Sequence, residues 1–375
     1  MRKFSLSFIL LFLFVLLTGC TETNILDRLG LTTLVGYDKG TDGERISTTA
    51  VIREVNPEFQ SNVEIVTTEN ETSKGSRTKS NRMLSKKITI GQMRVILFGE
   101  ELAKDNLHYY IDTHLQNAVV SNALYMAVVE GETTPLLKYD YKDIDDIGQH
   151  IFKLIQQNVE QEYMISPTLH EIAHDYYSIG QNFAMPIIKR DEELIALTGI
   201  ALFKEGKMVG KLSADDSFYV KLVKDSFKKG IFETILKKED FSNDLVKNTP
   251  SQMPIALDAI RSKRTWKLVD PSTPEFNLHF KLKARLLEIS PDVNLGDSKV
   301  VANLEKAISK NLSREISRVI AQTQEVDSDI FGFGEKYRSS VRKSNLTVEK
   351  WQKKYKNMKV NVSVDFVIVR DGVFE

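Results

Sequence analysis

The chain has very little cysteine: Cys20 is the one cysteine among 375 residues. Without a second thiol the chain can form no intramolecular disulfide and no cysteine-based zinc site. It also lacks an excess of charge of either sign, because 51 Lys and Arg residues balance 51 Asp and Glu residues. A neutral chain without a nucleic-acid-binding motif indicates no nucleic-acid partner. After Cys20 no apolar run approaches the roughly 20 residues that a membrane-spanning helix needs.

Cys20 itself follows the strongly apolar segment at the start of the chain. A positively charged beginning leads into the run Phe4–Leu17, and Thr18-Gly19-Cys20 comes directly after it. This is the layout of a secretory signal peptide. Leu-Thr-Gly-Cys also resembles the bacterial lipobox, which implies that residues 1–19 are removed. The resemblance further implies that Cys20 receives an S-diacylglyceryl group and an N-acyl chain such as palmitate. An ordinary secretory signal and an uncleaved anchor are the alternatives.

The length and patterning of the remaining chain predict several domains. Once residues 1–19 are removed, the chain is too long for one ordinary core, so about two or three domains are expected. Strands joined by hairpins, with helices between them, predict an α+β fold. We expect three mixed α/β domains with largely antiparallel sheets packed by helices. Their expected bounds are residues 20–190, 191–265 and 266–375.

Apolar periodicity predicts the individual elements. Strands are expected at residues 29–37, 45–53, 93–98, 124–129, 197–203, 207–212, 276–286 and 360–368. Helices are expected at residues 105–117 and 147–159, after Ser166-Pro167, after Ser213, and over about 25 residues from Ser298. Residues 60–81 are polar and hold few candidates for the core.

One motif matches a specific chemistry, His170-Glu171-Ile172-Ala173-His174. In zinc proteases with this pattern the two His side chains bind the metal and the Glu is the general base. However, Tyr177 stands where the longer motif requires Gly, and no third His follows at the spacing of that motif. The alternative is that His170 and His174 lie on a solvated or partly buried helix face without metal. A membrane-anchored zinc hydrolase that uses these three residues is therefore an alternative function.

The glycine-rich segment Phe331-Gly332-Phe333-Gly334 is not a phosphate-binding loop, because it lacks the Lys-Ser/Thr pair and a preceding strand. It predicts a bend after the long helix, with two aromatic side chains held in the core. Trp266 and Trp351 are expected to be packing residues. No catalytic triad or cofactor motif is present in the sequence. These residues favour a protein without enzymatic activity and without a cofactor.

Four segments, in order, resemble the Ger(x)C family, the lipoprotein C subunits of nutrient germinant receptors in endospore-forming bacteria. The first follows Cys20 and contains Asp27, Gly36 and Asp38. The others are Met93–Ala103, Gly199–Leu212, and Asp329–Glu335 with Trp351 and the closing Gly372. The family commonly has Trp-Asp directly after the lipidated cysteine, where this chain has Thr21-Glu22.

The resemblance implies a non-catalytic subunit that acts with two integral membrane subunits, A and B, in nutrient-triggered germination. It would be held by Cys20 on the outer, non-cytoplasmic face of the inner spore membrane. The implied fold is three mixed α/β domains. A solute-binding lipoprotein is a further alternative, but it would need two α/β lobes with repeated strand–helix alternation, which the sequence does not show.

Overall fold

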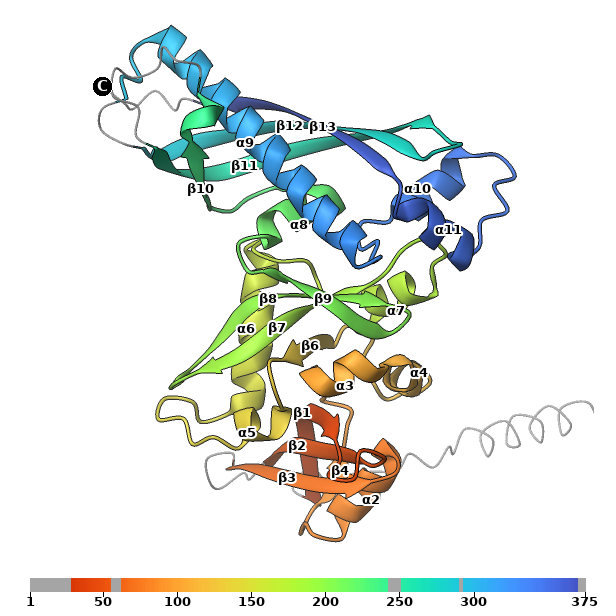
Figure 1. The fold of residues 1–375 in the computed structure, drawn as a ribbon. Coiled ribbons are helices and arrows are strands. Elements are labelled where there is room, and N and C mark those ends of the chain that lie inside the picture. Colours follow the sequence, from red (N-terminus) through yellow and green to blue (C-terminus); the bar gives the residue numbers. More distant parts are fainter. Residues whose placement is uncertain (1–27, 55–61, 242–250, 290–292, 370–375) are drawn as a thin grey trace, which may run out of the picture.

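The protein consists of two β-sheets with helices packed on them (Figure 1). The computed structural model describes residues 28–54, 62–241, 251–289 and 293–369. The expected signal peptide, residues 1–19, lies outside these ranges, as do Cys20, Asp27 and Gly372. The predicted mixed α/β class is confirmed.

The larger sheet has the strand order β3-β2-β1-β5-β6-β7-β8-β9, with β4 paired to β1. Its strands are β1 (Leu29–Lys39), β2 (Ile46–Glu54), β3 (Asn62–Asn70), β4 (Lys87–Thr89), β5 (Val95–Gly99), β6 (Tyr125–Val129), β7 (Ala184–Asp191), β8 (Leu194–Lys204) and β9 (Lys207–Ser213). The central strands β1, β5, β6 and β7 are parallel, and the outer pairs are antiparallel. This centre differs from the largely antiparallel pairing expected, because helical crossovers connect β5 to β6 and β6 to β7.

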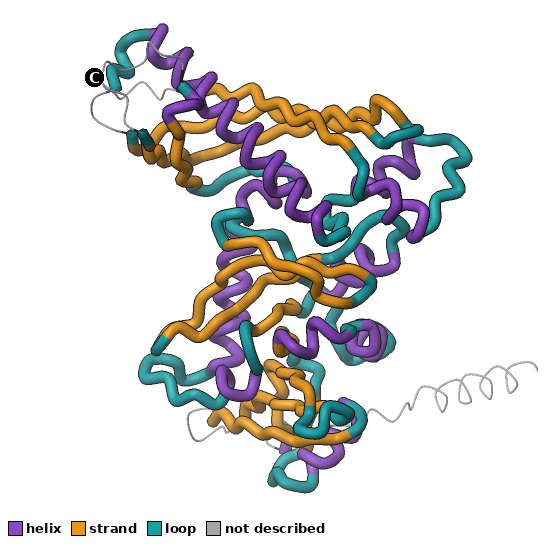
Figure 2. Tube along the Cα trace, viewed as in Figure 1, coloured by secondary structure: helices purple, strands orange, loops and turns teal. Residues whose placement is uncertain are grey.

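Helices cover both faces of the larger sheet (Figure 2). Helices α3 (Glu100–Asp105), α4 (His108–Leu115) and α7 (Leu169–Tyr177) share one core with strands β1, β5, β6 and β7. Helices α5 (Thr133–Leu137) and α6 (Ile147–Glu160) share the other. Helix α2 (Ser73–Asn81) packs near β2, β3 and β4. The result is a three-layer arrangement, in which each face of the sheet is shielded from water by helices.

The smaller sheet has the order β10-β11-β12-β13 and one long helix, α9 (Ser298–Glu325), packed across it (Figure 1). Its strands are β10 (Phe232–Lys237), β11 (Gln252–Asp270), β12 (Glu275–Glu288) and β13 (Lys359–Ile368). The expected apolar stripe of α9 is buried: Leu304, Ile308, Leu312, Ile316 and Val319. Helices α8 (Ser217–Lys224), α10 (Phe333–Ser340), α11 (Val348–Tyr355) and the short 3₁₀ turn η2 (Lys238–Asp240) complete this part.

The hairpin β8–β9 joins the two halves of the molecule. Along β8, Ala201 and Phe203 belong to a core of the larger sheet, whereas Ile200 and Leu202 belong to the core of the smaller sheet. The domain boundary expected at residues 190/191 falls inside β7, one residue before its end, and β7 pairs directly with β8. The boundary expected at residues 265/266 falls inside β11, which runs continuously for 19 residues. The units therefore share strands and cores.

Three local expectations differ from the structure. Residues 62–81 contain β3 and α2, which the polar composition did not indicate. Helix α7 has Thr168 as its N-cap, not Ser166, because Thr168 and Glu171 form a capping box. Helix α8 begins at Ser217 after Asp216, and the Ser213 N–H and hydroxyl donate to the Asp216 carboxylate at 3.0 and 2.8 Å.

Candidate functional site

The first family-like segment places Asp38 at the end of β1, where it is buried. Its carboxylate accepts hydrogen bonds from the N–H groups of Thr133 and Thr134 at 2.8 and 3.1 Å and from both threonine hydroxyls. Carboxylates at the first turn of a helix satisfy N–H groups that have no partner within the helix. Asp38 thus fixes α5 against the sheet. Its role in this structure is to position an element.

The last family-like segment surrounds a second buried carboxylate, Asp329. It accepts the backbone N–H groups of Gly332, Phe333 and Gly334 at 2.9–3.1 Å, and the Trp351 indole N–H at 2.9 Å. Burial raises the pKa of the Asp329 carboxyl to about 6, although these four donors lower it. As predicted, the segment is a bend after α9 with Phe331 and Phe333 buried. Gly332 adopts φ 78°, a conformation that favours glycine.

This bend contacts the larger-sheet half of the molecule directly. The Asn182 N–H donates to the Asp329 carbonyl at 2.8 Å, and the Asp329 N–H donates to the Asn182 side chain at 2.9 Å. Next to them, Gly180 and Gly334 approach so closely that a Cβ added to Gly334 would lie 2.4 Å from the Gly180 Cα. The buried Ser328 hydroxyl also donates to the Phe203 carbonyl at 2.6 Å. These contacts fix the two halves of the protein against each other.

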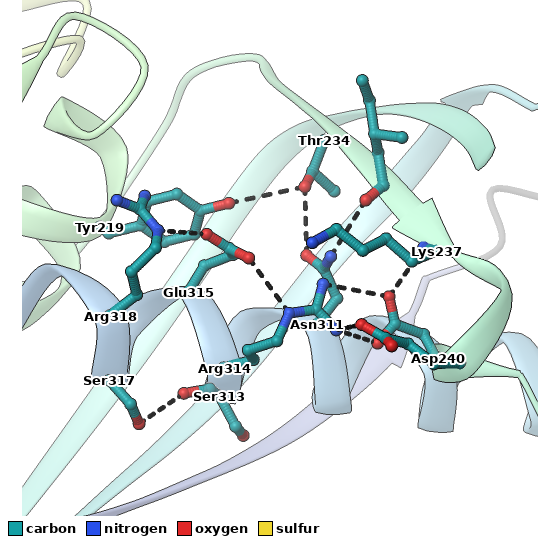
Figure 3. Close-up of polar contacts among 12 residues, drawn as sticks. Tyr219, Thr234, Lys237, Asp240, Asn311, Ser313, Arg314, Glu315, Ser317 and Arg318 are labelled. Carbon is teal, nitrogen blue, oxygen red and sulfur yellow. Dashed lines mark hydrogen bonds and ion pairs between the residues drawn. The ribbon is translucent and has the colours of Figure 1, made fainter. Parts of the chain in front are cut away.

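A cleft of about 760 Å³ lies between the β9 edge, β10 and α9. Beside it a chain of ion pairs runs along one face of α9, which we call the ion-pair chain: Asp216, Arg318, Glu315, Arg314 and Asp240. Asp216, Glu315 and Arg318 line the cleft, and Figure 3 shows the chain from Arg318 to Asp240. Arg314 contacts Asp240 and donates to Glu315 at 3.2 Å, and Arg318 donates to Glu315 at 2.7 Å and contacts Asp216. Asp216 precedes α8 and Asp240 lies in η2, so the ion-pair chain connects three elements.

Each carboxylate of the ion-pair chain has an arginine as its partner. Burial by itself raises the pKa of Asp240, but hydrogen bonds from Arg314 and the Lys237 N–H outweigh it and lower that pKa. Burial lowers the pKa of Arg314, and its bonds to Asp240 and Glu315 more than compensate and raise it. Every carboxylate of the ion-pair chain thus contacts an arginine, and these pairs hold α8, α9 and η2 together.

Asn311 of α9 also lines this cleft. Only 1% of Asn311 is exposed, and its side chain donates to the Ile235 carbonyl at 3.1 Å and accepts from the Thr234 hydroxyl at 3.1 Å (Figure 3). Ile235 lies on β10, an outer strand of the smaller sheet. An outer strand has carbonyl groups without a strand partner, so Asn311 provides a substitute partner from α9.

The zinc-protease-like motif lies on α7, as predicted, but its Glu has a structural role. Glu171 accepts from the Thr168 hydroxyl at 2.7 Å and from its N–H at 3.3 Å, completing the capping box. His170 is exposed, and the exposed His174 side chain lies 3.1 Å from Asp175. In the described ranges no three His, Cys, Asp or Glu side chains gather as a metal site. Likewise, no described helix is both long and apolar enough to cross a bilayer.

Comparison with known proteins identifies relatives along nearly the whole chain. Residues 22–190 match the family model "Spore germination protein N-terminal domain", and residues 198–372 match "Spore germination B3/ GerAC like, C-terminal". The chain is 27% identical to the spore germination protein GerQC of Bacillus cereus over 373 residues, which is 97% of this chain and 98% of that protein. It is 18% identical to the putative spore germination protein YfkR of Bacillus subtilis (strain 168), over 80% of this chain and 76% of that one.

The fold is also similar to a solved structure. The crystal structure of the GerBC protein superimposes with a TM-score of 0.54 and 17% sequence identity. The match covers 90% of this chain and 97% of that one. At this identity the similarity shows the fold alone.

Proposed function

Because this chain belongs to the Ger(x)C family of spore germination proteins, we propose that it is the lipid-anchored, non-catalytic C subunit of a nutrient germinant receptor. The observation that carries the proposal is the extent of the family match. Two germination-protein models together account for residues 22–190 and 198–372, starting two positions after Cys20.

In this proposal, acylated Cys20 holds the protein on the outer face of the inner spore membrane. A single acyl chain binds a membrane only marginally, whereas two or more anchor it stably. The S-diacylglyceryl and N-acyl groups together meet that requirement. The integral membrane A and B subunits would carry the membrane-spanning part of the receptor, and this chain would contribute folded domains beside the membrane.

A non-catalytic role is supported by what the buried charged residues do. Asp38 and Asp329 satisfy helix and loop N–H groups, and the ion-pair chain joins α8, α9 and η2. Glu171, the candidate general base of the zinc alternative, is engaged in the capping box of α7. These groups position elements of the fold. The cleft beside the ion-pair chain is a surface that a partner subunit could bind.

Replacing the cysteine tests the proposal. We expect Cys20→Ala to release the protein from spore membranes and to impair nutrient germination, because the acyl acceptor is absent. Thr21→Ala, one residue further, is the matched control and should leave both unchanged. Normal membrane retention and germination in Cys20→Ala would overturn the proposal. Stoichiometric zinc that is lost in His170→Ala would instead favour the hydrolase.

A further inference from the structure

A small cavity lies in the first half of the molecule, away from the cleft and the ion-pair chain. It has a volume of about 60 Å³ and lies between β1, β2, α2 and α4. A single buried water needs about 10–15 Å³, so this space has room for a small molecule of several non-hydrogen atoms. Most of its wall is apolar, from residues such as Val35, Ala50, Ile88 and Met93. Such walls with few polar groups are typical of small-molecule sites.

Two hydroxyl groups in the wall have no hydrogen-bond partner in the structure. Thr32 and Thr48, which are 1% and 8% exposed, both line the cavity, and the Oγ1 atom of each is buried and unpaired. A buried polar group without a partner costs about 1–3 kcal/mol. Two such costs at one cavity indicate that the hydroxyls are placed for a molecule that enters it.

A β-bulge is the reason that Thr32 faces the cavity. Between Thr32 and Leu34 the register of β1 against β2 shifts by one residue, so Thr33 is extra on β1. Side chains alternate faces along a strand, and one extra residue reverses the alternation. Thr32 therefore lies on the same face as Val35 and Tyr37, and Thr48 of β2, which pairs with Tyr37, lines the same cavity. Without the bulge Thr32 would point to the other face of the sheet.

The charge around the cavity is positive. Lys74 and Arg77 of α2 line it, no acidic residue does, and neither cation has an ion pair within the described ranges. Deeper in, the Tyr37 hydroxyl lies 3.1 Å from the buried His114 Nε2. Burial lowers the pKa of His114 to about 4, so this ring is neutral at physiological pH. The cavity thus combines cations in its wall with a neutral, hydroxyl-bearing interior.

We propose that this cavity binds a small carboxylate with a short apolar chain. The carboxylate would pair with Arg77, aided by Lys74, because a guanidinium matches a carboxylate in geometry and charge. The chain would contact Val35, Ala50 and Met93, and the Thr32 and Thr48 hydroxyls would donate to the carboxylate oxygens or accept hydrogen bonds from an ammonium group. Such a molecule is either a plain carboxylic acid or an α-amino acid, whose ammonium group would donate hydrogen bonds to the hydroxyl oxygens. The inference does not depend on the proposed receptor role.

Calorimetric titration of the full-length protein in detergent, at low salt and pH 7, tests the site. The probes are butyrate, the uncharged butyramide and 2-aminobutyrate. We expect millimolar binding of butyrate and at least tenfold weaker binding of butyramide. If 2-aminobutyrate binds more tightly than butyrate, the ligand is an amino acid; if more weakly, it is a plain acid. Absence of binding for both carboxylates, or equal binding of butyrate and butyramide, would overturn the proposal.

Variants of the lining locate the binding. We expect Arg77→Gln to weaken butyrate binding at least tenfold, whereas Arg82→Gln, which removes a charge from the end of the same helix but not from the lining, should change it less than twofold. Ala50→Leu should abolish binding by filling the cavity. Unchanged binding in both Arg77→Gln and Ala50→Leu would overturn the assignment to this cavity. Circular dichroism establishes whether each variant is folded. If Ala50→Leu is not folded, the nearly isosteric Thr48→Val takes its place and should weaken binding severalfold.

Discussion

The close approach of Gly180 and Gly334 can be tested with a matched pair of glycine substitutions. Gly180 and Gly131 have nearly the same positive φ, 92° and 91°. A Cβ on Gly131 would have nothing within 4 Å, whereas a Cβ on Gly180 would lie 2.6 Å from the Gly334 Cα. Replacing either by alanine therefore places a side chain at the same unfavourable φ, but only Gly180→Ala adds a clash between the two halves of the protein.

The expected magnitudes follow from these two terms. An alanine in the left-handed region costs about 1–2 kcal/mol, so Gly131→Ala should lower the free energy of unfolding by about that much. Overpacking of a rigid contact adds about 1–3 kcal/mol or more. The clash would also lengthen the bond from the Glu335 N–H to the Gly180 carbonyl, now 3.3 Å. We expect Gly180→Ala to cost about 2–5 kcal/mol.

Gly334→Ala tests the same contact from its other side, where helix propensity alone predicts the opposite change in stability. Gly334 lies in α10, where alanine would normally stabilise the helix by about 0.5–1 kcal/mol. The contact with Gly180 instead predicts a loss of stability. Urea unfolding followed by tryptophan fluorescence suits all three variants, because Trp351 bonds to Asp329 beside the contact. A cost for Gly180→Ala within about 0.5 kcal/mol of that for Gly131→Ala, or a stabilised Gly334→Ala, would refute the close contact.

Three further predictions concern single polar groups. The folded pKa of Asp329, about 6, exceeds its ordinary 3.8, so the stabilisation by its protonated form is complete below about pH 4 and is lost as pH rises through 6. Relative to Asp329→Asn, wild type should lose about 2 kcal/mol of unfolding free energy between pH 4 and pH 7; a pH-independent difference in urea titrations would contradict this. Asn311→Ala should cost about 2–3 kcal/mol by leaving the Ile235 carbonyl without its partner, and a thermal-unfolding loss below about 0.5 kcal/mol would contradict that bond. Glu171→Ala should cost about 1 kcal/mol through the capping box, whereas the exposed His174→Ala should cost less than half as much in the same assay.

Much of the fold was predictable wherever one face of an element is buried. β12 and β13 alternate apolar and polar residues along their length, and α9 carries an apolar stripe, so their periodicity predicted them. The helix starts were less predictable. Thr168 and Ser166 both have side chains that can cap a helix, and only the reciprocal bond with Glu171 decides between them. The parallel centre of the larger sheet depends on which strands meet, which local pattern does not encode.

The candidate sites were predictable only in part. Asp329 and Trp351 were singled out as a family-like segment, but their mutual bond and the contact of Gly334 with Gly180 join positions far apart in the sequence. The ion-pair chain was missed, because surface-type charges spaced along α9 look the same whether they face solvent or a neighbouring element. The i, i+4 spacing of Arg314 and Arg318 indicated a shared helix face and nothing about their partners.

Helix α2, which was the least predictable helix from the sequence, lines the cavity. It contains no apolar residue, and Ser, Thr, Asn and Gly are weak helix formers. Its formation depends on its Thr72 cap and on bonds from Thr68 to Ser76 and Ser80. A packing helix over the apolar groups of β1 and β2 would ordinarily present apolar side chains. Helix α2 instead presents Ser73, Arg77 and Ser80 to that space, so the hydrophobic stabilisation of an apolar contact is lost. A polar ligand between helix and sheet would offset this loss. The same feature that hid α2 from sequence analysis is therefore the strongest physical reason to expect a ligand beneath it.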